Sequence, residues 1–233
     1  MTVEDFKNGQ VFIIDKPLKW TSFQVVNKMR WAIRNKFKLK KIKVGHAGTL
    51  DPLATGILII CTGKFTKKIN TYQSEAKEYT GTITLGATTP SFDLETEIDQ
   101  TYATDHITEK EIFEAAKSFE GLIQQKPPIY SAIKKDGVRL YELARKGEHA
   151  EIESREVEIF AFEITDISMP VISFRIECSK GTYIRSIASD FGEKLNSGGH
   201  LSSLRRTKSG SFNVESALTL DTFLEQLGHE TIS

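Results

Sequence analysis

The pattern of apolar and polar positions predicts a chain rich in short strands. Apolar runs typical of buried strands lie at 11–14, 57–61, 157–164 and 171–178, and a strand pair is predicted in 201–212. Residues 77–85 alternate instead, which is typical of a half-buried antiparallel strand. The face that this alternation turns inward is made of Tyr79, Gly81, Ile83 and Leu85.

Helices are predicted where apolar residues recur every three or four positions. Capping residues precede three such stretches: Thr21 or Ser22, Thr108 in a capping box with Glu111, and Thr182. The second helix runs to Phe119, and a terminal helix covers 220–227. The inward faces of the first and third helices are Phe23, Val26, Met29 and Ile33, and Ile184, Ile187, Phe191 and Leu195. Strands and helices mix without a regular βαβ order, which favours an α+β fold with a mixed, largely antiparallel sheet.

Composition is that of an ordinary globular protein, with 39% apolar and 27% charged residues. No apolar run is long enough for a membrane span, and the polar start MTVEDFKNGQ is unlike a signal peptide. Cys61 and Cys178 lie in strand-like runs and are expected to be buried free thiols in a reducing cytoplasm. No Cys–His cluster has metal-binding spacing, so we expect no metal.

Charge is distributed unevenly although the net charge is zero. Residues 1–70 hold 14 Lys and Arg against 4 Asp and Glu, and the remainder holds 17 against 27. The most basic run is Arg34 to Lys43, with six bases and no acid. A solvated lysine-rich surface is one interpretation of this run. Binding of a polyanion is the other, and it is favoured by the chain that follows.

That following segment, Gly45 to Gly56, reads GHAGTLDPLATG and carries a lone carboxylate, Asp51, among glycines. Pro52 restricts the chain directly after it, and Gly48 permits a tight turn. Asp51 is then a turn cap, a nucleophile, a general base or a metal ligand. No other acid lies between residues 16 and 74 to share a metal or to support phosphoryl transfer, and Gly63-Lys64-Phe65 lacks the Ser or Thr of a phosphate loop.

The Asp51 segment closely resembles the catalytic-aspartate motif of the TruB-type tRNA pseudouridine synthases. Five further blocks resemble that family's motifs in the family's order: DKPLKWTS (15–22), KEYTGTITLGATTPSFD (77–93), QKPPIYSAIKKDGVRLYELARKG (125–147), CSKGTYIRSIASDFG (178–192) and HLSSLRRTKSGSF (200–212). The resemblance implies the pseudouridine synthase fold as a single catalytic domain over residues 1–233, with a cleft across the sheet.

The resemblance also implies an activity, the isomerisation of uridine to pseudouridine at position 55 in the TΨC arm of tRNA, without a cofactor. In this interpretation Asp51 is catalytic, Arg185 pairs with it, and Tyr79 stacks on the target base and relays a proton from C5. Leu204 lines the pocket, and His46 fills the space left by the flipped-out uridine. Asp51 either bonds covalently to sugar or base, or drives elimination to a glycal.

Several bases are implied as contacts to RNA phosphates, namely Lys16, Lys64, Lys67, Lys134, Lys135, Arg205 and Arg206. Residues 126–150 would form a basic insertion that is mobile without RNA and clasps it when bound. Each of these bases alone is equally consistent with a solvated surface charge. On residues alone, Arg185 reads as a helix-surface arginine, Tyr79 and Leu204 as core residues, and His46 as a turn residue.

Two departures from the family's pattern change the expectations. Lys19 stands where the first motif usually has glycine, which places the local turn in question. No C-terminal RNA-binding domain is expected, so the catalytic domain and its insertion would hold the tRNA. We expect a cytoplasmic monomer that does not bind membranes. The alternatives are an RNA-binding or tRNA-folding protein on the same scaffold, and a nucleoside glycosidase, which a single carboxylate disfavours.

Overall fold

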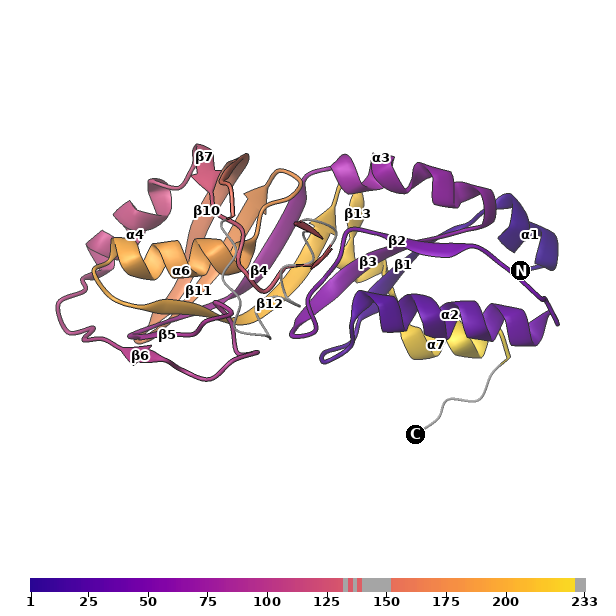
Figure 1. Cartoon of the computed structure of the whole chain (residues 1–233), viewed down its shortest axis with the longest axis horizontal. Helices are drawn as coiled ribbons and strands as arrows, with labels where there is room; N and C mark the ends of the chain where they lie inside the picture. Colours follow the sequence, from indigo (N-terminus) through magenta and orange to yellow (C-terminus); the bar gives the residue numbers. More distant parts are fainter. Residues whose placement is uncertain (132–133, 136–137, 140–151, 229–233) are drawn as a thin grey trace. The chain divides into compact units, whose positions relative to one another are not determined.

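The computed structural model describes residues 1–131, 134–135, 138–139 and 152–228 (Figure 1). The chain divides into two compact units. The first unit comprises Met1–Tyr79 and Leu204–Ser233, and the second comprises Thr80–Ser203. Helices combine with a mixed sheet that has parallel and antiparallel strand pairs, so the fold is α+β, as the sequence pattern predicts.

The sheet of the first unit is built around β1 (Val11–Lys16) and β3 (Ala54–Thr62), which pair antiparallel. β1 also pairs in parallel with β14 (Leu218–Thr219). On its other side β3 pairs in parallel with β12 (Gly199–Ser209), which turns back into β13 (Phe212–Asn213). β2 (Val44–Ala47) pairs antiparallel with β3, so the two strands bracket the predicted Asp51 loop.

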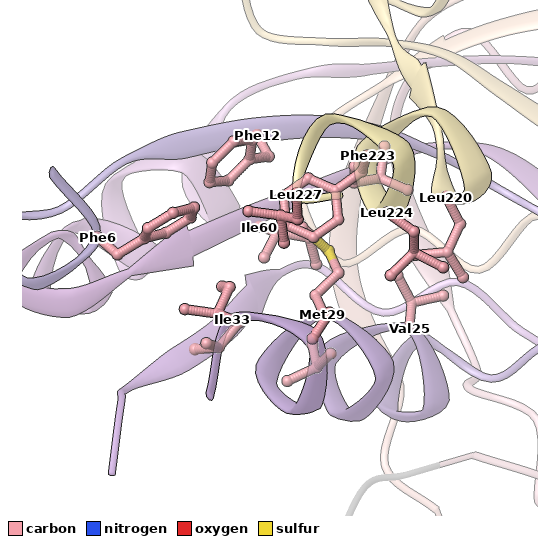
Figure 2. Packing of buried hydrophobic residues seen from close by; sticks show 14 of the residues in the cluster. Phe6, Phe12, Val25, Met29, Ile33, Ile60, Leu220, Phe223, Leu224 and Leu227 are labelled. Atoms are coloured by element: carbon pink, nitrogen blue, oxygen red, sulfur yellow. The ribbon is translucent and has the colours of Figure 1, made fainter. Parts of the chain in front are cut away.

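One core of this unit lies between the sheet and two helices, α2 (Ser22–Lys36) and α7 (Leu220–Gln226) (Figure 2). Met29 of α2 and Phe223 of α7 are fully buried. Phe12 of β1 meets the Phe223 ring edge-on at 5.1 Å between centroids. Aromatic burial of this kind contributes a large share of apolar stabilisation.

The predicted apolar face of α2 is confirmed at Val26, Met29 and Ile33 and wrong at Phe23. Phe23 is 64% exposed, while Ser22 takes the buried place in the first turn at 2% exposure. The hydroxyl of Ser22 bonds to the backbone of Leu50, so packing at this turn is decided by a hydrogen bond that apolar periodicity does not report.

Short helical segments complete the first unit, and the pattern of apolar positions did not predict them. They are α1 (Val3–Asn8), η1 (Gly63–Lys68), α3 (Ile69–Ser74) and η2 (Val214–Ser216). Each spans at most two turns, too few for a periodic apolar face to be visible in the sequence.

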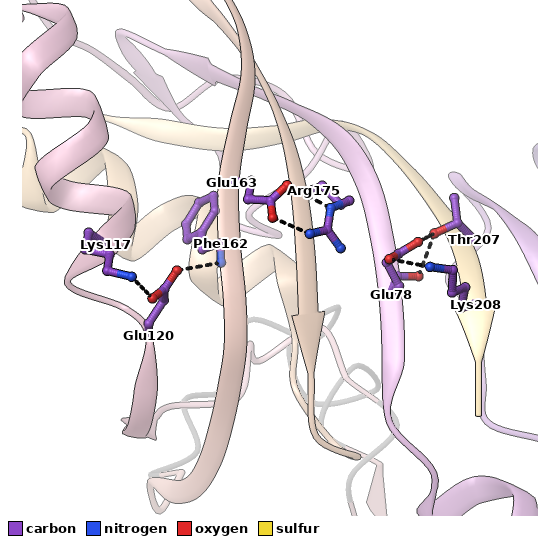
Figure 3. Close-up of polar contacts among 8 residues, drawn as sticks. All are labelled: Glu78, Lys117, Glu120, Phe162, Glu163, Arg175, Thr207 and Lys208. Carbon is purple, nitrogen blue, oxygen red and sulfur yellow. Dashed lines mark hydrogen bonds and ion pairs between the residues drawn. The ribbon is translucent and has the colours of Figure 1, made fainter. Parts of the chain in front are cut away.

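β4 (Lys77–Leu85) begins in the first unit and continues from Thr80 in the second, where β4, β11 (Val171–Cys178), β10 (Arg155–Ser168) and β7 (Gly121–Gln125) lie in that order. The Phe119, Phe162 and Phe191 rings meet beside this sheet, with Phe162–Phe191 centroids 5.5 Å apart. Side chains also bond across neighbouring strands of this sheet: Arg175 of β11 donates to the carboxylate of Glu163 on β10 (Figure 3). Four short strands also occur among the residues that the structure describes: β5 (Ala87–Thr88), β6 (Gln100–Thr101), β8 (Lys134–Lys135) and β9 (Val138–Arg139).

Two helices of the second unit match prediction in position but differ at one cap. α4 (Glu109–Lys117) begins after Thr108 with the predicted capping box. α6 (Ile184–Lys194) buries its predicted inward residues, but its N-cap is Tyr183 rather than Thr182. The Thr182 hydroxyl donates to the Ser179 carbonyl instead, so it shapes the preceding turn.

Cys61 and Cys178 are both buried and neither forms a disulfide, as predicted. Burial raises the pKa of the Cys61 thiol to about 11, so this thiol stays protonated and unreactive at neutral pH. Within the described part of the chain, no helix has both the length and the apolar character needed to cross a membrane.

Candidate active site

Asp51 lies in the short loop between β2 and β3, where the chain reverses. The Ala54 amide donates to the Asp51 carbonyl at 3.1 Å and closes the turn that starts β3. Gly48 adopts φ +92°, a conformation that side chains rarely take, so glycine is required there by the path of the loop. Leu50 is buried and anchors the loop on the core side.

Ser22 holds the loop through both backbone groups of Leu50. Its hydroxyl donates to the Leu50 carbonyl at 3.0 Å and accepts from the Leu50 amide at 2.9 Å. The capping box of Thr21 and Gln24 fixes the start of α2, so Ser22 is set on the first helical turn. From the sequence, Ser22 was named only as an alternative to Thr21 for the helix cap, which is Thr21, and its support of the Asp51 loop was not predicted.

Lys16 fixes the loop on its other side, from the end of β1. It is fully buried, and its ammonium donates to the carbonyls of Pro17 at 2.9 Å, Trp20 at 2.5 Å and Pro52 at 3.3 Å. Three donors therefore meet three carbonyl acceptors. Burial lowers the pKa of Lys16 to about 8, against the opposing attraction of the Asp51 charge. Lys16 is therefore a buried cation whose charge interacts with the charge of Asp51.

Arg206, on β12, reaches the same loop from a third direction. It is 1% exposed, and its Nε donates to the Ile57 carbonyl at 2.8 Å while Nη2 donates to the Gly48 carbonyl at 3.1 Å. His46, on β2, has its pKa lowered by burial and then by the Arg206 charge, so its imidazole is neutral at physiological pH. Lys16 and Arg206 therefore bind carbonyls of the protein rather than face solvent.

Leu204 and Arg205 precede Arg206 on the same strand and pair in register with the end of the loop. Leu204 lies opposite Ala54, and Arg205 lies opposite Thr55. Arg205 is partly exposed and makes a two-pronged ion pair with Asp15, at 2.6 Å and 3.1 Å. Of the two adjacent arginines, Arg205 thus keeps the guanidinium nearer to solvent, though it already has a carboxylate partner.

Tyr79 lies on β4 in the first unit and is 8% exposed. Its neighbour Glu78 accepts from the Thr207 hydroxyl at 2.8 Å and from the Lys208 ammonium at 3.0 Å (Figure 3). These contacts fix the start of β4 against the part of β12 that follows Arg206. Glu78 was not identified from the sequence.

Arg185 belongs to the second unit, in the first turn of α6, and is buried. Its Nη1 and Nη2 donate to the carbonyls of Ser91 at 3.1 Å and Tyr130 at 2.9 Å, and its Nε lies 3.6 Å from a carboxylate oxygen of Asp93. The partnership with Asp93 was not predicted. The predicted pairing of Arg185 with Asp51 stays a prediction.

The segment that leads into the predicted insertion is held against α6. Gln125 bonds both backbone groups of Tyr183, at 2.7 Å and 3.0 Å, and the Ser186 hydroxyl donates to the Lys126 carbonyl. The bond to Lys126 concerns only the start of the predicted insertion, and the mobility of residues 126–150 stays a prediction for this start as for the remainder. Most of that remainder, residues 132–133, 136–137 and 140–150, lies outside the described residues.

The other predicted cations are spread over the chain. Lys64 is exposed on η1 and donates to the Asn8 side chain at 3.0 Å, and Lys67 is exposed nearby. Lys134 and Lys135 form β8 (Lys134–Lys135), which pairs with β9. In the basic run, Lys40 and Lys41 are exposed. No group of three or more His, Cys, Asp or Glu residues placed to hold a metal occurs among the described residues.

Comparison with known families finds two matching models. The model of the TruB family pseudouridylate synthase N-terminal domain matches residues 34–184, and that of the tRNA pseudouridylate synthase B C-terminal domain matches residues 185–231. A tRNA pseudouridine synthase B from Flavobacterium johnsoniae is 64% identical over 97% of this chain and 100% of its own length. One from Phocaeicola vulgatus is 55% identical over 98% of this chain and 97% of its own.

Solved structures give the same fold at lower identity. A chain in a Cbf5-Nop10-Gar1 complex superimposes with a TM-score of 0.70 and 30% identity over 94% of this chain. A chain of an H/ACA RNP bound to a substrate RNA containing 2′-deoxyuridine has a TM-score of 0.66 and 28% identity over 97% of this chain. The match spans 54% and 57% of those two chains, a little more than half of their length.

Proposed function

The chain belongs to the TruB family of pseudouridylate synthases and is therefore an isomerase; on that premise we propose that it converts uridine to pseudouridine in tRNA, at position 55 of the TΨC arm. Relatives named tRNA pseudouridine synthase B match nearly its whole length. The observation that carries the proposal is the position of Asp51, a carboxylate in a loop held from three directions by Ser22, Lys16 and Arg206.

The proposed reaction is a cofactor-free rearrangement within one nucleoside. The N1–C1′ bond breaks, the uracil turns, and C5 bonds to C1′, while the C5 proton is lost and N1 gains a proton. Asp51 either forms a covalent bond to sugar or base, or removes a C2′ proton to give a glycal. A rigid loop suits both routes, because covalent and general-base catalysis depend on a fixed reacting distance.

The remaining residues are proposed to serve binding and proton transfer. Arg185 pairs with Asp51 and keeps it ionised, Tyr79 stacks on the flipped uracil and relays the C5 proton, and Leu204 lines the pocket. His46, neutral at physiological pH, stacks in the gap that the extruded base leaves. Extrusion from the RNA stack costs a few kcal/mol, which such stacking partly offsets.

The proposed set of phosphate contacts is smaller than the sequence suggested. Burial of Lys16 and Arg206 and their bonds to backbone carbonyls give them a structural role. Lys64, Lys67, Arg205 and the exposed bases of the Arg34–Lys43 run remain proposed contacts. Lys134 and Lys135 also remain proposed contacts. Because neither Cys61 nor Cys178 forms a disulfide, we also propose action in the reducing cytoplasm. We further propose that the chain acts as a monomer.

Tritium release tests the function directly, because pseudouridine formation removes the hydrogen from C5. With tRNA tritiated at uridine C5, the wild-type chain is expected to release tritium and Asp51→Asn to release none. Asp221→Asn, which changes a carboxylate in the first turn of α7, is the matched control and should act like wild type. A tRNA with cytidine in place of the uridine at position 55 should release no tritium.

The alternative is an RNA-binding or tRNA-folding protein on the same scaffold, which the basic Arg34–Lys43 run would also suit. It predicts that wild type and Asp51→Asn bind tRNA equally and that neither releases tritium. Release from wild type that persists in Asp51→Asn would instead assign the chemistry to another residue. Release that persists with the cytidine-substituted tRNA would move the target to another uridine.

A further inference from the structure

We propose that Arg206 is a positioning residue for Asp51: its buried guanidinium ties the Gly48 carbonyl of the Asp51 loop to the Ile57 carbonyl of β3. This inference rests on the proposed function, since it assigns a role within that reaction. It replaces the interpretation of Arg206 as an RNA phosphate contact, which its side chain, at 1% exposure, cannot reach without rearrangement.

The close pairing of β12 with β3 places Arg206 next to the Asp51 loop. The two strands are parallel, and Arg206 lies opposite Gly56. A Cβ added at Gly56 would lie 2.2 Å from the Arg206 carbonyl oxygen, and Gly56 itself adopts φ +98°. Glycine at position 56 therefore permits the close backbone contact that sets the guanidinium beneath the Asp51 loop.

The two carbonyls that Arg206 joins belong to different parts of the structure, one in a strand and one in a loop. Ile57 is fully buried within β3, whereas Gly48 lies in the loop, three residues before Asp51. Bonds of 2.8 Å from Nε and 3.1 Å from Nη2 therefore fasten a loop carbonyl to a strand carbonyl. A planar guanidinium makes both bonds at once, which a single ammonium cannot do in the same geometry.

The loop thus has separate supports on the two sides of Asp51. Arg206 holds Gly48 before it, while Lys16 and the Lys19 amide hold Pro52 after it. The Arg206 charge also acts on its surroundings, since it contributes to the lowered pKa values of His46 and Lys16. Without the guanidinium, Gly48 would keep the conformational freedom of glycine, and the path from residue 48 to Asp51 would loosen.

Steady-state kinetics separates positioning from phosphate binding. Arg206→Met should lower kcat for tritium release by about a hundredfold, the loss typical of a misplacement near 1 Å, and leave KM for tRNA and its salt dependence near wild type. The kcat of Arg206→Lys should lie between those of wild type and Arg206→Met. Arg30→Met is the matched control, because it also removes an arginine bond to a backbone carbonyl, that of Val44 at 2.9 Å, and should retain kcat.

Two further measurements distinguish a positioning role of Arg206 from a general loss of structure in the variant. Gly48→Ala leaves the guanidinium in place but strains the same loop residue, so its kcat loss should be less than additive with that of Arg206→Met. The pKa of His46, followed by NMR, should rise in Arg206→Met because a nearby positive charge is removed. If Arg206→Met does not fold, Arg206→Lys and Gly48→Ala carry the test.

The outcomes distinguish this inference from the proposed function. If wild type releases no tritium, the proposed function fails first. If wild type is active and Arg206→Met raises KM with a shallower salt slope at unchanged kcat, Arg206 is a phosphate contact and the inference is overturned. Unchanged kinetics in all variants, additive losses with Gly48→Ala, or an unchanged His46 pKa would also overturn it.

Discussion

For Lys16 and Arg206, a positive charge in the sequence suggested RNA binding, whereas the structure gives both side chains bonds to the protein's own backbone. Both are cations in motif blocks associated with RNA, yet both are buried and bonded to backbone carbonyls. For Lys16 the sequence did contain a signal. Phe12, Ile14 and Lys16 occupy alternate positions of β1, so strand period alone places the lysine on the buried face. For Arg206 the flanking sequence has no comparable pattern.

Replacing Lys16 tests its role as a buried support. Lys16→Met should lower the free energy of unfolding by about 2–4 kcal/mol, because three backbone carbonyls each lose a hydrogen bond from a buried ammonium. Urea denaturation measures this loss. Lys64→Met is the matched control, since Lys64 is exposed and bonds only the Asn8 side chain in the described structure, and it should change stability by no more than about 0.5 kcal/mol.

The pH dependence of the same comparison follows from the lowered pKa. The folded pKa of Lys16 is about 8 and its ordinary value is 10.5. Between these values the unfolded chain binds more protons than the folded one, so the unfolding free energy of wild type rises with pH relative to Lys16→Met. The gap between the two proteins should widen from pH 8 upward and be constant below it. A gap that narrows over that range would contradict the burial assigned to the ammonium.

At the scale of elements, the turn between β1 and α2 keeps a conformation that favours glycine although Lys19 occupies it. The resemblance of residues 15–22 to the family's first motif implies glycine at this position, and the φ of Lys19 is +65°, in the left-handed region. Its amide donates to the Pro52 carbonyl at 2.8 Å, so the turn between β1 and α2 retains its contact with the Asp51 loop. The backbone thus keeps the conformation that suits glycine and carries a side chain there at some cost.

Lys19→Gly should therefore stabilise the protein, by up to about 1 kcal/mol. Relief of left-handed strain of about 1–2 kcal/mol is partly offset by the greater backbone entropy of glycine in the unfolded chain. Lys36→Gly, in the last turn of α2, should instead destabilise by about 1 kcal/mol. Thermal unfolding of both variants measures the contrast, and a loss of stability in Lys19→Gly would show that its side chain contributes more than its strain costs.

The elements that could be predicted are those with a local cause. The α4 capping box and the inward residues of α6 are each visible within one stretch of sequence, and the structure confirms them. The alternation predicted for β4 is confirmed at Tyr79, Ile83 and Leu85 but is wrong at Glu78, which lies on the opposite face and is buried as well. β2 was missed because four residues with a glycine show no clear alternation. The N-cap of α6 was misplaced because Gln125, far away in the chain, already bonds both backbone groups of Tyr183.

At the scale of the whole molecule, the asymmetry of charge has a counterpart in the fold. The basic residues 1–70 fall entirely in the first unit, which also holds Asp51, His46, Tyr79 and Leu204. Candidate site residues as far apart in the chain as Lys16 and Arg206 are brought into this unit by the pairing of β3 with β1 and with β12. The grouping of these residues depends on strand pairing between distant parts of the chain. Composition and periodicity did not predict this grouping, whereas the resemblance of the motifs to a known family did.

Exposed bases of this unit are expected to supply a salt-dependent share of tRNA binding. Lys40 and Lys41 are exposed in the basic run, so replacing both with Ala should weaken binding. The slope of log K against log salt should become shallower by about 0.7–0.9 for each RNA phosphate that the protein no longer neutralises. Replacing Lys110 and Lys117, exposed on α4 of the acidic remainder, removes the same charge and is the matched control. Equal slopes in the two double variants would mean that only net charge matters and that the run does not bind phosphates directly.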